Sequence, residues 1–406
     1  MTVTAESLDI PTIPFLQEQT RAARQATLRE VASQSWIARN DLGYSVLTYE
    51  GVTGILRDKR WHSATGLISQ IQGITDERFL SRRRVSILSA EGDTHVRLRR
   101  LVAPAFSPRS ADRLRPFMRD VVNNLVDNVA PAGSAEVVAD ICEPYPIPII
   151  CELLGAPKED WQLFSRLAGD VLRIFSGNLA QELDIVIAAQ DELSEYARGL
   201  IADRRKTPAD DLITDLIAAE EAGDKLDTEE LAMMVEAVIV GGTDTTRNQL
   251  GLALALFAEH PEQWALLARD PSLAPRAVEE TMRYHGAVGG TVRFASEDIE
   301  YNGILFPKGT FMSTSMSSAN FDSSVFPDPL RFDITREPVG QPQLSFGSGI
   351  HYCLGASLAR AELQEALTIL ATRMPNLVLD GDVTYKPAVV GIFGPAHLPV
   401  RFDAGH

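Results

Sequence analysis

The chain has 406 residues, 45% of them hydrophobic, so it is long enough to bury a large core. Its formal net charge of −17 argues against a nucleic-acid backbone as the main partner, because such binding relies on clustered Lys and Arg side chains. The three cysteines, Cys142, Cys151 and Cys353, are too few and too irregularly spaced for a disulfide framework, and no CxxC pair indicates a zinc site.

The N-terminal stretch "MTVTAESLDIPTIPF" lacks the basic flank and apolar run of a signal peptide. The most apolar predicted helix contains Glu236, Asp244 and Arg247, which excludes it as a membrane span. We therefore expect a cytoplasmic protein without a membrane anchor, in which residues 1–14 form a flexible leader.

The remaining elements predict a mainly helical chain. Residues 15–32 are predicted to form a helix, and "YSVLTY" at 44–49 alternates as a half-buried strand does. From about residue 94 to 270 the pattern is helical, with Pro or Gly at each break. The pair Asn302-Gly303 suits a tight hairpin turn, and "HLPVRFD" near the C-terminus is typical of a strand. With no internal repeat or linker, the sequence predicts one mainly α domain with small β-sheets over residues 1–406.

The helical part includes the stretch "AEGDTHVRLRRLVAPAFSPRS", in which His95 and Arg99 are four residues apart and share one helix face. A solvated basic helix is the simplest interpretation of the "RLRR" run in this stretch.

Residues 227–259 are predicted to form one long helix, with Asp227 and Glu230 at capping-box spacing. Its middle reads "VGGTDTTRN", and the glycine pair costs about 1 kcal/mol per residue relative to Ala. One interpretation is a tolerated kink on a polar face. The other is that the helix passes over a cofactor and opens its hydrogen-bond ladder there, beside a hydroxyl and a carboxylate.

Further along, Glu280 and Arg283 in "EETMR" are three residues apart on one helix face, where a carboxylate and a guanidinium can meet. The stretch "LSFGSGIHYCLGASLAR" then leads into a predicted helix that ends before Pro375. Cys353 therefore lies near a helix N-terminus, where free N–H groups stabilise a thiolate. The alternatives are a buried inert cysteine, a metal ligand or a nucleophile.

Together the motifs resemble the cytochrome P-450 superfamily. The Cys353 turn is similar to its haem-binding loop FGxGxHxCxG, "EETMR" to its ExxR, "VGGTDTT" to its (A/G)GxDT(T/S) and "HVRLR" to its HxxxR. The resemblance extends from "GYSVLTYEGVTGILRD" to "LPVRF" and implies a single-domain fold that holds haem between a long central helix and the Cys-bearing loop.

The resemblance also implies roles for individual residues. Cys353 would bind the iron of haem b as a thiolate, and Asp244 and Thr245 would deliver protons to bound oxygen. The remaining haem-binding residues would be His95, Arg99, Arg293, His351, Phe346, Gly347, Gly349, Gly355, Gly241 and Gly242. Behind the haem, a structural cluster would consist of Glu280, Arg283 and Arg331.

The implied activity is insertion of one oxygen atom of O2 into a small, largely apolar substrate by a monomeric enzyme. Electrons would come from NAD(P)H through a reductase and an acidic ferredoxin, which Arg97 and Arg100 could help to dock. A peroxide-driven peroxygenase and a non-enzymatic haem sensor or carrier are the alternatives. The expected substrate pocket comprises Val240, Val288, Gly289, Gly290 and Phe393.

Overall fold

The protein is described by a computed structural model that covers residues 3–14, 21–64, 67, 69, 73–175, 179–221, 227–386 and 391–404. The helices run as follows: α1 Arg21–Ala32, α2 Tyr49–Arg57, α4 Glu77–Val85, α5 Gly92–Val102, α6 Pro108–Val129, α7 Pro146–Leu154, α8 Trp161–Leu172, α9 Leu179–Lys206, α10 Leu212–Glu221, α11 Thr228–Glu259, α12 Pro261–Arg269, α13 Ala274–Tyr284, α14 Met316–Ala319 and α15 Ala356–Arg373.

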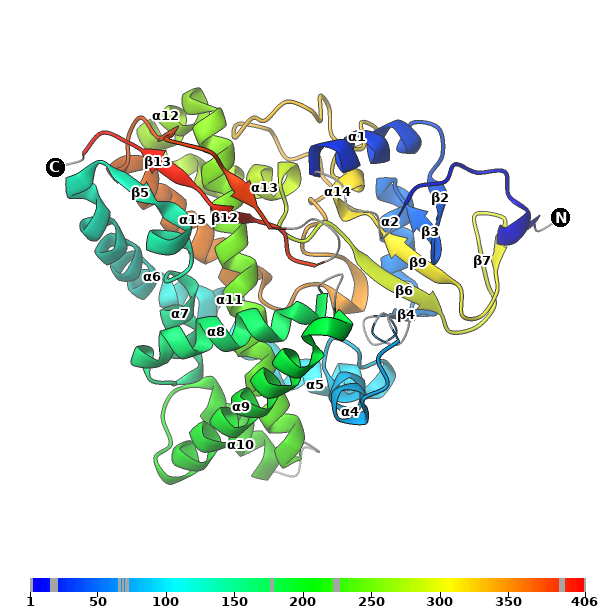
Figure 1. The fold of residues 1–406 in the computed structure, drawn as a ribbon, viewed down its shortest axis with the longest axis horizontal. Coiled ribbons are helices and arrows are strands. Elements are labelled where there is room, and N and C mark those ends of the chain that lie inside the picture. The colour runs from blue at the N-terminus through cyan, green and yellow to red at the C-terminus, as the bar shows by residue number, and fades with distance from the viewer. Residues whose placement is uncertain are drawn as a thin grey trace.

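The strands are short and lie mainly toward the two ends of the molecule, with the large sheet at the end that holds the N-terminus (Figure 1). They are β1 Val3–Thr4, β2 Ile37–Asn40, β3 Gly43–Val46, β4 Trp61–Ser63, β5 Ser134–Glu136, β6 Thr291–Ala295, β7 Ile299–Tyr301, β8 Ile304–Phe306, β9 Phe311–Thr314, β10 Val378–Leu379, β11 Thr384–Tyr385, β12 Pro395–His397 and β13 Pro399–Arg401. The largest sheet has the order β2-β3-β9-β6-β4. The prediction of a mainly helical fold with small sheets is confirmed.

The long helix α11 crosses the centre of the helical part and packs against α7, α8, α9 and α15 (Figure 1). Asp227 caps it: its carboxylate accepts from the backbone N–H of Glu230 at 2.8 Å, and the Glu230 carboxylate accepts in return from the N–H of Asp227 at 3.2 Å. The predicted capping box and helix length are both confirmed. The helix assignment of α11 is continuous across the glycine pair, and an opened hydrogen-bond ladder there stays a prediction.

The hairpin prediction is also confirmed, since Asn302 and Gly303 take positive φ values of 51° and 75° between β7 and β8. The strand predicted over 44–49 is too long. It ends at Val46, because the Thr48 hydroxyl accepts from the N–H of Gly51 and begins α2. The helix predicted over 15–32 is seen from residue 21 onward, and residues 15–20 lie outside the described part of the chain.

The N-terminal residues differ from the expected flexible leader. Val3 and Thr4 form β1 and pair in parallel with Ile304 and Leu305 of β8, and Ala5 is fully buried. The reason is that the exposed edge of the β7–β8 hairpin offers free backbone groups to a passing segment. Within the described part of the chain, no helix is long and apolar enough to cross a membrane.

Candidate active site

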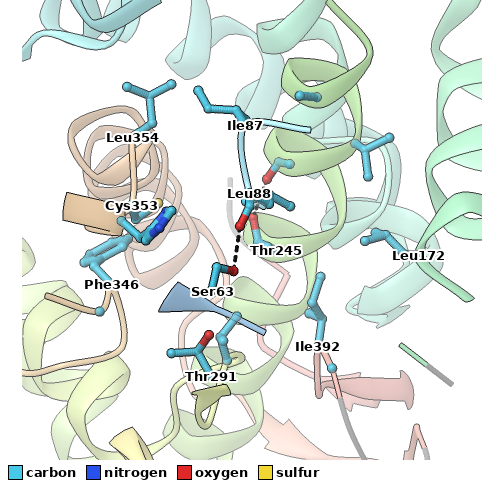
Figure 2. A pocket seen from close by; sticks show the side chains of 18 of the residues that line it. Ser63, Ile87, Leu88, Leu172, Thr245, Thr291, Phe346, Cys353, Leu354 and Ile392 are labelled. Atoms are coloured by element: carbon cyan, nitrogen blue, oxygen red, sulfur yellow. Dashed lines mark hydrogen bonds between the residues drawn. The ribbon is translucent and has the colours of Figure 1, made fainter. Parts of the chain in front are cut away.

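A cavity of about 1070 Å³ lies between α11 and the loop that carries Cys353. Its walls come from α4, α5, α9, α11, β6, the loop before α15 and the segment before β12. Figure 2 shows Cys353 and Phe346 on the loop side of this cavity and Thr245 on the helix across from them. The structure therefore brings together the two motifs that are about a hundred residues apart in sequence.

Two glycines shape the Cys353 loop, and they do so for different reasons. Gly347 and Gly349 have φ values of 73° and 72°, which favour glycine. A side chain at Gly349 would overlap the carbonyl oxygen of Leu56 in α2, whereas one at Gly347 would meet nothing within 4 Å. The backbone N–H of Cys353 donates to the carbonyl of Phe346 at 2.9 Å and closes the turn. The close contact with α2 therefore requires a glycine at position 349, whereas the glycine at position 347 leaves open space beside the loop.

Cys353 precedes α15, whose N-cap is Gly355, as predicted. Burial raises the pKa of the Cys353 thiol, and the backbone N–H of Gly355 and the guanidinium groups of Arg99 and Arg360 oppose that effect. The exposed surface of this residue faces the cavity, since Cys353 belongs to its lining. The nearby guanidinium groups favour a thiolate, and a bound cation would offset the remaining cost of burying its negative charge.

Cationic and imidazole groups form one rim of the cavity. Arg293 on β6 is buried, which lowers its pKa to about 10, and Arg99 donates to the carbonyl of Tyr352. The rings of His95 and His351 lie 4.3 Å apart. Burial, His351 and Arg99 lower the pKa of His95 to about 4, and its Nε2 has no hydrogen-bond partner among the described residues. These groups fit an anionic ligand edge such as the two carboxylates of haem.

The glycine pair on α11 faces two different neighbours. A Cβ on Gly241 would meet nothing within 4 Å, whereas one on Gly242 would overlap Ile150 of α7. The Thr245 hydroxyl lines the cavity and donates to the carbonyl of Gly241 at 2.8 Å. Gly242 also belongs to the cavity lining, but its lack of a side chain serves the contact with α7.

Asp244 lies on another side of α11, in a small hollow that Glu143 and Arg247 also line. Its carboxylate accepts from Arg247 and, at 3.3 Å, from the amine of Lys386. Arg247 in turn binds Glu143 at 3.1 Å. The structure therefore places Thr245 at the cavity and Asp244 in a neighbouring ion-pair network, so the paired proton-delivery role stays a prediction.

Glu362 on α15 was missed by sequence reasoning. It is fully buried at the cavity wall, where the Thr246 hydroxyl donates to its Oε2 at 3.2 Å. Its Oε1 has no partner among the described residues, and burial raises the pKa of this carboxyl to about 8. The available signal was a carboxylate four residues from both Leu358 and Ala366, on the apolar face of the helix.

The structural cluster contains a different arginine from the one expected. Glu280 accepts from Nε of Arg283 at 2.7 Å and from Nε of Arg336 at 3.1 Å. Arg331 is wrong as the third member, because its side chain is 65% exposed and binds Asp333. The backbone N–H of Asp333 also donates to the Glu280 carboxylate at 3.0 Å. The turn after Asp333 places the Arg336 side chain against the same carboxylate. Arg331 contributes its carbonyl, which accepts from both other arginines.

All five expected substrate residues line the cavity. Val288 is held by a β-bridge to Ile392, beside Phe393. A Cβ on Gly290 would lie 2.6 Å from the carbonyl oxygen of Thr314, so this glycine permits a close backbone contact and does not mark open space. The remaining members of the predicted set are Val240 and Gly289.

Comparison with known proteins identifies the class. Residues 156–268 and 272–373, just over half of the chain, match the family model "Cytochrome P450". The chain belongs to the cytochrome P450 family. It is accordingly an oxidoreductase, a P450 monooxygenase with a haem-iron cofactor, and the family uses O2 and redox partners.

Several curated bacterial enzymes are similar over most of their length. The chain is 38% identical to luteothin monooxygenase of Streptomyces thioluteus, with 92% of each chain covered. It is also 38% identical to nocardicin C N-oxygenase of Nocardia uniformis subsp. tsuyamanensis, over 88% of this chain and 89% of that one.

Solved structures agree with this placement. CalO2 superposes with a TM-score of 0.90 at 28% identity, covering 98% of this chain and all of the other. P450BioI, solved with an acyl carrier protein that carries hexadec-9Z-enoic acid, gives a TM-score of 0.87 at 31% identity, over 94% and 99% of the two chains.

Proposed function

We propose that this P450 inserts one oxygen atom of O2 into a small, largely apolar organic molecule, using non-covalently held haem b. The observation that carries the proposal is the position of Cys353, which lies across the cavity from Thr245 (Figure 2) and shares the cavity lining with Gly241 and the cationic rim. Haem b is supported by that rim and by the sequence, which contains no CxxCH motif for covalent attachment.

Different residues of this chain bind haem and deliver protons. Cys353 ligates the iron as a thiolate, and His95, Arg99, Arg293 and His351 bind the propionates. When bound, haem supplies the activation of O2. Thr245 holds a proton at Oγ1 on the open side of α11, and the network around Asp244 is the proposed source from which that proton is replaced.

The proposed electron source is NAD(P)H, through a reductase and a ferredoxin that docks near Cys353. The docking face includes Tyr352, which is 37% exposed, and the exposed Arg100 on α5. Arg97 has another task, because it binds the Glu230 carboxylate at 2.5 Å and ties α5 to the start of α11. The three free cysteines support a reducing, cytoplasmic location.

The first test is the absorption spectrum of the dithionite-reduced protein with carbon monoxide. The wild type should show the strongly red-shifted Soret band of thiolate-ligated haem, and Cys353→Ser should lose it. Cys142→Ala is the matched control, because Cys142 is fully buried in the core and should keep the band. A variant at Cys353 that retains the thiolate-type band would overturn the ligand assignment.

The second test concerns proton delivery. Thr245→Ala should bind haem and substrate yet divert electrons from NAD(P)H to hydrogen peroxide, because the hydroxyl at the cavity is gone. Thr228→Ala, at an exposed position of the same helix, is the control and should leave the coupling unchanged. Unchanged coupling of NAD(P)H use to product in Thr245→Ala would remove this residue from the role.

A further inference from the structure

The part of the cavity near the start of α11 is polar. Four side chains from three helices line it, and we refer to them as the polar cluster: Arg82 on α4, Gln190 and Ser194 on α9 and Glu236 on α11. Glu236 is nine residues before Thr245, which places the two about 13 Å apart along the helix axis. The polar cluster therefore lies away from the part of the cavity beside Thr245.

Gln190 is the member that most clearly lacks a partner. It is 8% exposed, it belongs to the cavity lining, and its Oε1 has no hydrogen-bond partner among the described residues. Ser194 is one turn further along α9 and lies near Glu236, where it opposes the rise of that carboxyl's pKa. A buried carboxamide oxygen without a partner is costly, and a ligand that donates to it would remove that cost.

Arg82 offers the complementary group. Its Nη2 binds Asp191 at 2.5 Å, while its Nη1 is buried and has no hydrogen-bond partner among the described residues. The cluster therefore presents an unmet acceptor on α9 and an unmet donor on α4. A hydroxyl or a carboxamide can satisfy both, because each of these groups donates and accepts.

Charged groups of both signs surround the polar cluster. Arg82 is neutralised by Asp191, and Arg198 binds Glu229 at 2.7 Å. Burial raises the pKa of Glu236, which Ser194, Arg82 and Arg198 oppose. A negative charge on the ligand would be repelled by the carboxyl groups of Asp191, Glu229 and Glu236, and a positive charge would be repelled by Arg82 and Arg198.

We propose that the polar cluster binds a neutral hydrogen-bonding group of the substrate, a hydroxyl or a carboxamide, and so holds a distant C–H bond beside Thr245. This inference rests on the proposed function and specifies its substrate class: a mainly apolar molecule with a neutral polar group about ten bonds from the oxidised carbon. The anchor fixes which carbon is presented, because it sets the distance to the reacting end.

The test uses the haem-loaded protein and five probes that share an unbranched ten-carbon chain: decan-1-ol, decanamide, decanoate, decyltrimethylammonium and 1-fluorodecane. Binding is measured by the low-to-high-spin shift of the ferric protein and by calorimetry. Decan-1-ol and decanamide should bind at least fivefold more tightly than 1-fluorodecane, which matches the alcohol in size but cannot donate. Tightest binding of decanoate, tightest binding of the ammonium, or no preference for the neutral donors would each overturn the proposal.

Gln190→Leu should weaken decan-1-ol binding about fivefold and leave 1-fluorodecane binding unchanged or tighter. Gln181→Leu, at an exposed position of the same helix, is the matched control and should change neither. If Gln190→Leu fails to fold, Ser194→Ala provides a second variant with the same expected direction. Equal effects on alcohol and fluoride would overturn the inference.

The carbon monoxide spectrum distinguishes failure of the proposed function from failure of the polar anchor. Absence of the thiolate band in the wild type would overturn the proposed function itself. A normal band without any preference for the neutral donors would overturn the polar anchor alone.

Discussion

Glu362 gives a sharp prediction about stability and pH. This fully buried carboxyl has a pKa of about 8, raised from an ordinary value of 4.5 by burial, with the Thr246 hydroxyl acting in the opposite direction. Its proton is therefore held more tightly in the folded protein than in the unfolded chain. Such a group causes no loss of stability below pH 4.5, and the loss grows as the pH rises toward 8.

The magnitude follows from the two pKa values. The linkage relation gives a destabilisation of about 1 kcal/mol at pH 5.5 and about 4 kcal/mol at pH 8, so about 3 kcal/mol is lost across this interval. With about 2.1 cal/mol/K of unfolding entropy per residue, 1 kcal/mol corresponds to about 1.2 °C in a 406-residue chain. The wild type should therefore lose about 3–4 °C more than a variant that cannot titrate at this position.

Glu362→Gln is that variant, because glutamine keeps the size of the side chain and the oxygen that accepts from Thr246. The assay is the thermal midpoint of both holoproteins from pH 5.5 to 8, followed at the Soret band, with the variant's pH dependence subtracted. Glu300→Gln, at an exposed position on β7, controls for the change in net charge. Parallel pH profiles for wild type and Glu362→Gln would refute the reasoning.

Two further contrasts use neighbouring positions as controls for each other. Arg336→Ala should lower the free energy of unfolding by about 3 kcal/mol and reduce haem content, because it removes a partner of the buried Glu280. Arg331→Ala should change the free energy of unfolding by no more than about 0.5 kcal/mol. Equal losses in thermal midpoint would contradict the assignment. Gly242→Ala should cost about 1–3 kcal/mol by overpacking α7, whereas Gly241→Ala, with open space beside it, should be neutral or stabilising by up to about 1 kcal/mol. Thermal unfolding of the two variants checks this, and the reverse order would contradict it.

The predictions that rest on local chemistry agree with the structure. The capping box at Asp227 and the hairpin turn at Asn302-Gly303 depend on a few neighbouring residues, so their patterns are readable without tertiary information. The position of Cys353 before a helix is of the same kind, because the glycines before it and the long helix-forming run after it are both local signals.

The predictions that depend on packing are the ones that differ. Arg331 and Arg336 are both near the expected position, and the sequence does not say which of them a turn directs onto Glu280. The close approach of Gly290 to the carbonyl of Thr314 is likewise a matter of packing, because no neighbouring residue in the sequence indicates that contact. The polar cluster lies beyond local patterns as well, because its members come from three helices.

The contact between Thr246 and Glu362 shows how the two halves of the site are held in register. Thr246 follows Thr245 on α11, and Glu362 lies on the helix that begins directly after the Cys353 loop. Apolar side chains of α11 and α15 can slide past one another at small cost, whereas a buried hydrogen bond is satisfied in one alignment. We infer that this bond fixes the distance between the threonine side and the thiolate side of the cavity. Glu362→Gln should then preserve the carbon monoxide spectrum, whereas Glu362→Leu, which removes the acceptor, should broaden or shift it; an unchanged spectrum in both variants would contradict this role.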